Sequence, residues 1–189
     1  MKLNKFLRPS RFIWALLLLS LIPRIFIALE PIDSHEALYA QPIAEFMAEP
    51  KPFLTYLGTP SYYKPPLTIY IYSALVYPLV WLPLPFELIY RLPSVLFGVL
   101  SIYIFYLLIK NLFGEETALI SAFIFSLTNL VIASQTALLT DSLANFLILL
   151  SVFLYTKRGK RNFLFACLFS ALAFLSKSVL SFIIPSLAV

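Results

Sequence analysis

The chain has 189 residues, of which 61% are hydrophobic and only 12% are charged, and its mean hydropathy is +0.91. A soluble domain carries about 25% charged residues, so this composition excludes a water-soluble globular protein and indicates an integral membrane protein. The net charge of +5 does not indicate nucleic-acid binding, because the basic residues cluster beside apolar runs as cytoplasmic flanks do. Cys167 is the only cysteine, which excludes a disulfide framework and a cysteine metal site.

The first apolar run, residues 12–29, predicts a membrane-spanning helix. At ~1.5 Å per residue it is about 27 Å long, close to the ~30 Å hydrocarbon core of a bilayer. No small-residue cleavage site follows the basic start, so we expect an uncleaved helix rather than a signal peptide. Arg24 lies near its far end, where it either snorkels to the interface or faces an anionic ligand.

The next segment, residues 30–91, is predicted to be an outer loop that carries the function. Seven of its ionisable residues stand out: Asp33, His35, Glu36, Glu45, Glu49, Lys51 and Lys64. Ionisable groups are costly in hydrocarbon, so a membrane protein that collects them in one loop usually functions there.

A short helix is predicted to open this loop, beginning near Ser34. Asp33 can cap it, and Glu36 at the third position completes a capping box. Four apolar side chains then share one face of the helix: Tyr39, Ile43, Phe46 and Met47. We therefore expect a helix that lies on the membrane with its apolar face toward lipid.

Four further helices are predicted to span the membrane, at 92–109, 117–133, 142–156 and 163–185. The N-terminus and the basic segment 157–162 are both expected on the cytoplasmic side, so an even number of crossings lies between them. The weakest candidate is 67–84, which contains prolines and several Tyr and Trp side chains that favour the headgroup level. We therefore assign it to a second helix at the outer interface.

The predicted fold is therefore an all-α, multi-pass membrane protein with five spanning helices and two interfacial helices in the first outer loop. The whole chain, 1–189, is predicted to be a single membrane domain. On this topology seven ionisable side chains converge on the outer face: Asp33, His35, Glu36, Lys64, Arg91, Asp141 and Lys177. Carboxylates can act as general bases or metal ligands, and basic residues can hold a phosphate. The combination suits a substrate with a lipid tail and a phosphate head.

Simpler interpretations of these residues stay open. The three acids can be helix caps, and His35 can be a solvated interfacial side chain. Lys64 can snorkel, and Arg91 can anchor a helix end. Lys177 lies about 15 residues, or about 22 Å, into the last predicted helix, and an intramembrane lysine is a functional candidate by default.

Six motifs carry a resemblance to a known family: HEALYAQPIAEFM, YYKPPL, RLPSVLFG, LFGEETALISA, LLTDSLANF and LAFLSKS. In this order they resemble the N-terminal part of the class C (GT-C) glycosyltransferases, which take sugars from polyprenyl phosphates. Within that class the chain is most similar to the aminoarabinose transferases and protein O-mannosyltransferases. Members of the class are much longer, so we expect either a truncated or split gene product or a fragment of a longer protein.

The resemblance implies roles for the acids of the loop. The family's acidic pair falls on His35 and Glu36, and its first member is usually Asp. Because this chain has His35 there, Asp33 is the candidate substitute for the catalytic base. Asp141 matches an acid near the outer cavity, so the predicted catalytic residues are Asp33, Glu36 and Asp141.

The resemblance also implies substrate-binding residues. Lys64 matches a lysine that contacts the lipid-linked phosphate, and Lys177 matches a second family lysine. Tyr39 matches a family tyrosine, which in aminoarabinose-transferring members often follows an arginine; here Leu38 precedes it. The predicted substrate-binding set is Lys64, Arg24, His35, Tyr39 and Lys177.

The predicted function is transfer of a hexosyl or pentosyl group from a polyprenyl-phosphate donor to a lipid, protein or glycan acceptor on the outer face of the cell membrane. A divalent metal can take part in such chemistry, although no ligand motif indicates one. A second chain that carries the missing helices is a further expected partner, and nucleic acid is not. The alternative is a truncated, non-catalytic membrane fragment or subunit that binds polyprenyl lipid. A transporter is disfavoured because no repeat or pair of broken helices is visible.

Overall fold

The computed structural model describes residues 11–62, 64–157 and 159–177. These residues form eight helices and one small hairpin, named here in chain order: α1 (Arg11–Ala28), α2 (Ser34–Ala48), β1 (Thr55–Tyr56), β2 (Thr59–Pro60), α3 (Pro66–Val76), α4 (Phe86–Phe113), α5 (Glu115–Leu127), α6 (Asn129–Thr136), α7 (Asp141–Thr156) and α8 (Lys160–Ser176). The predicted all-α class is confirmed, apart from the two-residue strands of the hairpin.

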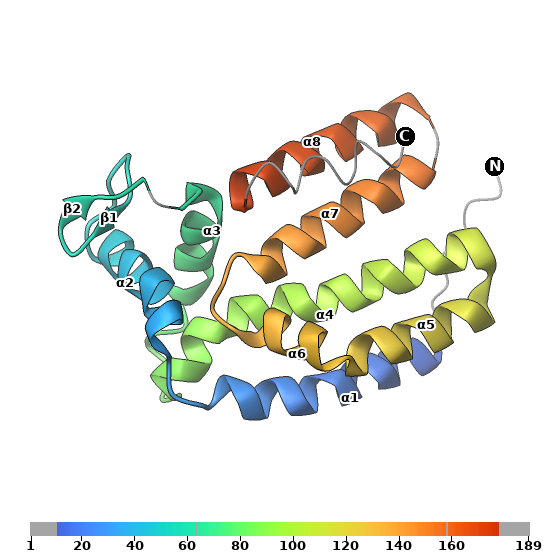
Figure 1. Cartoon of the computed structure of the whole chain (residues 1–189), viewed down its shortest axis with the longest axis horizontal. Coiled ribbons are helices and arrows are strands. Elements are labelled where there is room, and N and C mark those ends of the chain that lie inside the picture. Colours follow the sequence, from blue (N-terminus) through green and yellow to red (C-terminus); the bar gives the residue numbers. More distant parts are fainter. Residues whose placement is uncertain (1–10, 63, 158, 178–189) are drawn as a thin grey trace.

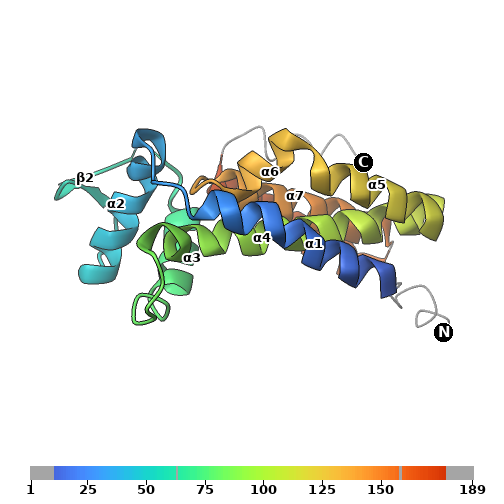
Figure 2. The ribbon, with the colours of Figure 1, turned by 90° about the horizontal axis from the view of Figure 1, so that it is seen from below.

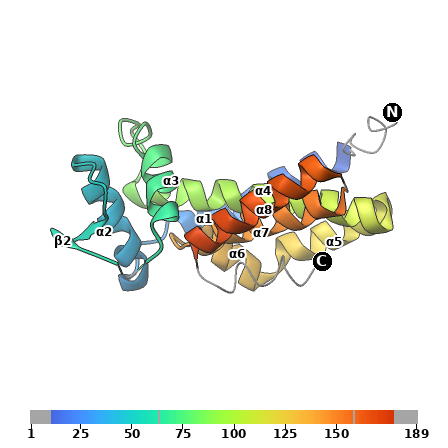
Figure 3. The same cartoon turned by 90° about the horizontal axis from the view of Figure 1, so that it is seen from above.

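The long helices lie side by side, and the loop elements gather at one end of them (Figure 1). The central helix is α4, which packs against α1, α5 and α7, while α7 packs against α8. Seen from above, α7 and α8 run along α4 (Figure 3). The same separation of α2, α3 and the hairpin from the long helices is visible from below (Figure 2). We call the end that carries α2, α3 and the hairpin the loop end.

Two helices, α1 and α4, are long and apolar enough to cross a membrane, and the bent pair α5–α6 makes a third if it counts as one span. The expected count of five spans is therefore not reached within the described residues. Helices α7 and α8 have 16 and 17 described residues, which correspond to about 24 and 26 Å at ~1.5 Å per residue. The expected last helix was 163–185, of which residues 178–185 lie outside the described part of the chain.

Helix α4 begins earlier than expected. The prediction of 92–109 placed Arg91 at the helix start, but the helix runs from Phe86 to Phe113 behind Pro85. Pro93 is the second residue of the predicted range, a position that suits proline, whereas the structure accommodates it deeper within the helix. Arg91 therefore lies inside the helix and is 4% exposed, rather than at a solvated end.

The expected single helix 117–133 is broken in two. Helices α5 and α6 meet at Thr128, which is extended (φ −64°, ψ 122°), and the two axes differ by 66°. The Thr128 hydroxyl donates to the Ile124 carbonyl at 2.9 Å, so the side chain competes with the helical hydrogen-bond ladder. The polar pair Thr128-Asn129 within an apolar run is the sequence feature that marks the break.

The first loop helix forms as predicted, but its apolar face contacts protein. Helix α2 begins at Ser34 with Asp33 as its N-cap, and the capping box with Glu36 is complete. Tyr39 and Ile43 are buried in a core cluster that also contains residues of α3, α4 and α7. The expectation that this face rests on lipid is wrong, because α3 and the hairpin cover it.

The second loop helix is shorter than the predicted 67–84. Helix α3 ends at Val76, and its 11 residues give about 17 Å, too short to cross a ~30 Å hydrocarbon core. Between α2 and α3 the chain makes a hairpin whose turn residues, Leu57 and Gly58, both have positive φ. This backbone is the one that two-residue hairpin turns require.

Candidate functional site

Among the carboxylate–cation pairs of the loop end, Glu36–Arg91 and Asp141–Lys177 contain acids that the sequence nominated as catalytic. The first lies between α2 and α4, and the second joins the first residue of α7 to the residue that follows α8. The surroundings of each pair decide what its acid can do.

Glu36 is held on both carboxylate oxygens. Its Oε1 accepts from Arg91 Nε at 2.8 Å and from the Leu138 amide at 2.7 Å. Its Oε2 accepts from Arg91 Nη2 and from the Asp33 amide, the latter at 3.3 Å. The side chains of both members of the pair are only 5% exposed. One carboxylate thus ties α2 to α4 and to the segment between α6 and α7.

Arg91 extends this network to the end of α1. Besides Glu36, its guanidinium donates to four carbonyl oxygens, those of Ile27, Ala28, Glu30 and Pro31. These carbonyls lie at the last turn of α1 and in the connection to α2. An arginine with several fixed donors is suited to such a junction. We call Glu36 and Arg91 the buried clamp.

The clamp also fixes the protonation state of Glu36. Burial raises the pKa of this carboxyl, but the hydrogen bonds from Arg91 and the Leu138 amide outweigh it, so the pKa lies below its usual value. An efficient general base has a pKa near the working pH and a free lone pair facing the substrate. The geometry of Glu36 therefore fits a structural role.

Asp33 performs its predicted capping role. Its Oδ1 accepts from the Glu36 amide at 2.7 Å, and its side chain is exposed. Neighbouring His35 is also exposed, and its ring lies 6.2 Å from that of Tyr39 in an edge-on arrangement. Neither Asp33 nor His35 lines the two cavities described next.

Two cavities meet at Lys64. The larger has a volume of about 620 Å³ and is lined by Lys64, Lys177 and the hydroxyl-bearing side chains Ser61, Tyr62 and Tyr70, together with apolar residues of α8 and the α2–α3 connection. The smaller has a volume of about 180 Å³ and lies between α2, the hairpin and α3. The Lys64 ammonium also lies 5.0 Å from the centre of the Tyr39 ring, a cation–π contact that draws two predicted binding residues together.

Lys177 follows α8 as its C-cap and pairs with Asp141, the first residue of α7. The predicted position of Lys177 deep inside a helix is thus wrong for the described residues, since α8 ends at Ser176. The pair is partly open, with 44% of the lysine and 26% of the aspartate side chain exposed. A carboxylate at the first turn of α7 is also favoured by the helix dipole.

Arg24 lies away from both cavities, inside the α1 span. It is fully buried, and its guanidinium donates to the Ser20 carbonyl at 2.8 Å and to Gln135 Oε1 at 2.9 Å. A longer bond of 3.4 Å reaches the Ser126 carbonyl at the end of α5. Arg24 therefore links α1 to α5 and α6 by hydrogen bonds. Among the described residues, no carboxylate pairs with it.

The structure thus divides the predicted site. Lys64 and Lys177 line the larger cavity, where Tyr39 contacts Lys64 and Asp141 pairs with Lys177 without lining a cavity themselves. Glu36 lies in the buried clamp, and Arg24 lies in the span. The sequence predicted that Arg91 either joins the charged groups of the outer face or anchors a helix end, and it did not predict the pairing with Glu36. The signal was available, because an arginine flanked by apolar helical residues needs an internal partner.

A metal site is not formed by the described residues. Across 11–62, 64–157 and 159–177, no three His, Cys, Asp or Glu side chains gather closely enough to hold an ion. At the larger cavity, the described residues supply two ammonium groups and several hydroxyls, with the Asp141 carboxylate beside Lys177.

Comparisons with known proteins identify the fold and the family of the chain. The crystal structure of ArnT from Cupriavidus metallidurans in the apo state is similar to the chain with a TM-score of 0.72 and 19% identity, over 90% of this chain and 33% of that one. The chain therefore shares its fold and spans about a third of its length. No match was found among curated proteins. The profile of one family matches residues 63–189, so the chain belongs to the dolichyl-phosphate-mannose-protein mannosyltransferase family.

Proposed function

We propose that the chain is the N-terminal part of a membrane glycosyltransferase that transfers a sugar from a polyprenyl-phosphate donor to an acceptor on the outer face of the cell membrane. The observation that carries the proposal is that Lys64 and Lys177, from segments far apart in the sequence, line one cavity. No acid belongs to the described lining of that cavity, and although Asp141 pairs with Lys177, the charge of Lys64 leaves this group of three side chains net positive, which favours an anion. Membership of a mannosyltransferase family supports the reaction class.

In this proposal the donor phosphate lies against Lys64 and Lys177. The bond between the sugar's anomeric carbon and the phosphate oxygen breaks as the acceptor oxygen bonds to that carbon. The leaving phosphate gains negative charge, which the ammonium groups stabilise. The proton of the acceptor hydroxyl passes to a carboxylate acting as general base.

Asp141 is the carboxylate that we assign to this role. Asp141 pairs with Lys177, which lines the larger cavity, whereas Glu36 is held by Arg91 and by two backbone amides in a buried position. A donor phosphate competes with Asp141 for Lys177, and the carboxylate released in this way can accept a proton from the acceptor. Glu36 and Asp33 belong to the scaffold in this scheme, and Tyr39 positions Lys64 through its ring face.

The second candidate is a non-catalytic fragment or subunit that binds polyprenyl lipid without transferring sugar. In this candidate the lipid phosphate occupies the same cavity, lined by Lys64 and Lys177. A second chain would then supply the remaining helices and the acceptor side of the cavity. The two candidates share the phosphate site and differ only in catalysis.

The test of the shared site is retention of undecaprenyl phosphate by the purified parent chain and by Lys64→Gln in detergent. A charge-assisted hydrogen bond contributes ~1.5–3 kcal/mol, so the variant should bind about ten- to a hundredfold more weakly. The matched control is Lys51→Gln, whose lysine pairs with Glu49 in the same loop and lines neither cavity. Equal affinity of the parent and Lys64→Gln would remove Lys64 from the site.

A transfer assay with a polyprenyl-phosphate sugar then separates the two candidates. Transfer that is lost in Asp141→Asn supports the enzyme. Binding without transfer by the parent chain supports the lipid-binding fragment.

A further inference from the structure

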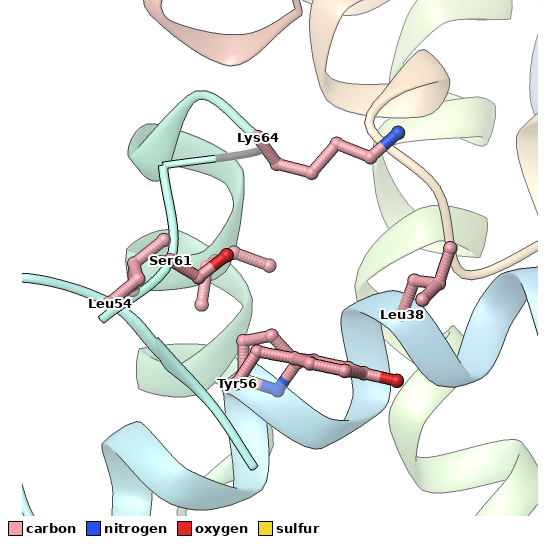
Figure 4. A pocket seen from close by; sticks show the side chains of 7 residues that line it. Leu38, Leu54, Tyr56, Ser61 and Lys64 are labelled. Carbon is pink, nitrogen blue, oxygen red and sulfur yellow. The ribbon is translucent and has the colours of Figure 1, made fainter. Parts of the chain in front are cut away.

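The smaller cavity beside Lys64 has walls of a different character from the larger one. Figure 4 shows Lys64 on one side of it and Tyr56 on the opposite side, with Leu38, Leu54 and Ser61 between them. Most of its wall is aliphatic, and Leu54 and Ile69 belong to the buried core, with 6% and 1% exposure. Its ammonium group comes from Lys64, which is the one charged side chain among the described residues that line it.

The two cavities share part of their walls. Leu54, Ser61 and Lys64 line both of them, so Lys64 stands where the cavities adjoin. On one side lies the larger space with the second ammonium group of Lys177, and on the other lies the smaller apolar space. A ligand that occupies both therefore needs an anionic group joined directly to an apolar group.

The size and the polarity of the smaller cavity limit which apolar groups it can bind. An apolar cavity of about 150 Å³ in another protein stays dry and binds benzene, so about 180 Å³ suits a group of five or six carbon atoms. A sugar ring fits poorly, because its hydroxyls need several partners and the lining supplies only the polar ends of Tyr56, Ser61 and Lys64.

We infer that the smaller cavity is a binding subsite for the apolar group attached to a lipid phosphate, while the phosphate itself lies at Lys64 in the larger cavity. This inference rests on the proposed phosphate site and adds the direction in which the lipid leaves it. The first unit of the lipid enters the space between α2, the hairpin and α3, and Leu38 forms part of the wall that it contacts. Lys64 then contacts the ligand where its phosphate joins the lipid chain.

The experiment compares two small water-soluble probes, dimethylallyl phosphate and methyl phosphate, on the purified full chain in detergent by calorimetry. The parent should bind dimethylallyl phosphate at least tenfold more tightly. A tenfold difference is ~1.4 kcal/mol, less than the burial of two methylene groups provides. This comparison needs no variant to fold.

Two tryptophan variants locate the effect. Leu38→Trp fills the smaller cavity, so it should remove the preference for dimethylallyl phosphate and leave methyl phosphate binding unchanged. Leu57→Trp is the matched control, since Leu57 lies at the hairpin turn with 70% exposure and lines neither cavity. Lys64→Gln should weaken both probes together.

The outcomes separate this inference from the proposed function. Equal affinity of the parent for the two probes, or a preference that survives Leu38→Trp, overturns the subsite and leaves the phosphate site in place. Failure of both probes to bind the parent overturns the subsite together with the phosphate site.

Discussion

The Glu36–Arg91 and Asp141–Lys177 pairs of the loop end are built from the same chemistry and differ in their surroundings. In the buried clamp both side chains are 5% exposed and every carboxylate oxygen is bonded, whereas Asp141 and Lys177 are 26% and 44% exposed beside a cavity. A buried pair is costly to break, and an exposed pair contributes about 0–1 kcal/mol. The comparison shows that burial and extra hydrogen bonds distinguish the first pair, and under the proposed function the second pair is the one that exchanges its partner for a substrate.

Loss of Arg91 should produce the largest effect. Arg91→Met leaves the Glu36 charge buried without its cation and removes a donor from four carbonyls, so the free energy of unfolding should fall by ~3–5 kcal/mol. Thermal and denaturant unfolding in detergent measure it. The control is Lys51→Met, which breaks an exposed pair and should change stability by less than ~0.5 kcal/mol. Similar losses in the two variants would show that burial does not distinguish the pairs.

Lowering the pH should remove the stability that the ionised Glu36 contributes through the buried clamp. Its folded pKa lies below the ordinary value of 4.5, so its stabilising contribution is fully present above pH 4.5 and is lost as pH falls through the lower, folded pKa. Glu36→Gln should cost ~1–3 kcal/mol near neutral pH, because a hydrogen bond to a charged group is lost. The parent and the variant should converge in stability as the pH drops below 4.5. A constant gap between their unfolding curves at every pH would argue against this assignment.

The Tyr72→Phe variant tests whether Glu36 alone is sufficient to hold residues 137–140, the segment before Asp141, in place. The Tyr72 hydroxyl lies 3.1 Å from Ser94 Oγ and 3.3 Å from the Leu139 carbonyl. The neighbouring Leu138 amide donates a hydrogen bond to Glu36. Tyr72→Phe removes only the hydroxyl, so the loss should be ~0.5–1.5 kcal/mol. Hydrogen exchange of the amides of residues 137–140 should accelerate as well. Unchanged exchange would mean that Glu36 is sufficient to hold the segment.

Substitution in the exposed pair Asp141–Lys177 should have the smallest effect on the free energy of unfolding, and its main effect should be on phosphate binding. Asp141→Asn should change the free energy of unfolding by less than ~1 kcal/mol, since both side chains remain partly solvated. Phosphate affinity should rise a fewfold, because Lys177 no longer has a competing carboxylate. Binding of methyl phosphate to the parent and to Asp141→Asn measures this. Weaker binding in the variant would mean that Asp141 orients Lys177 instead of competing for it.

The sequence by itself determined the local features whose causes are local. The apolar runs specified the helices, and the capping box at Asp33 and Glu36 specified the start of α2, because each depends on residues within one or two turns. The motif around Lys64 marked the residue at which the two cavities meet. The polar pair Thr128-Asn129 was the local signal for the break between α5 and α6, although one continuous helix was predicted there.

Only the tertiary structure decided which acid is buried and which pairs with a lysine that lines a cavity. Glu36 meets Arg91, 55 residues away, and the Leu138 amide, 102 residues away, and no periodicity encodes such partners. The same holds for Lys64 and Lys177, whose common cavity arises because α3 packs against α8. The pKa and the accessibility of a carboxylate depend on the groups that folding brings around it. Sequence could therefore nominate the acids, and the packing of distant helices assigned their roles.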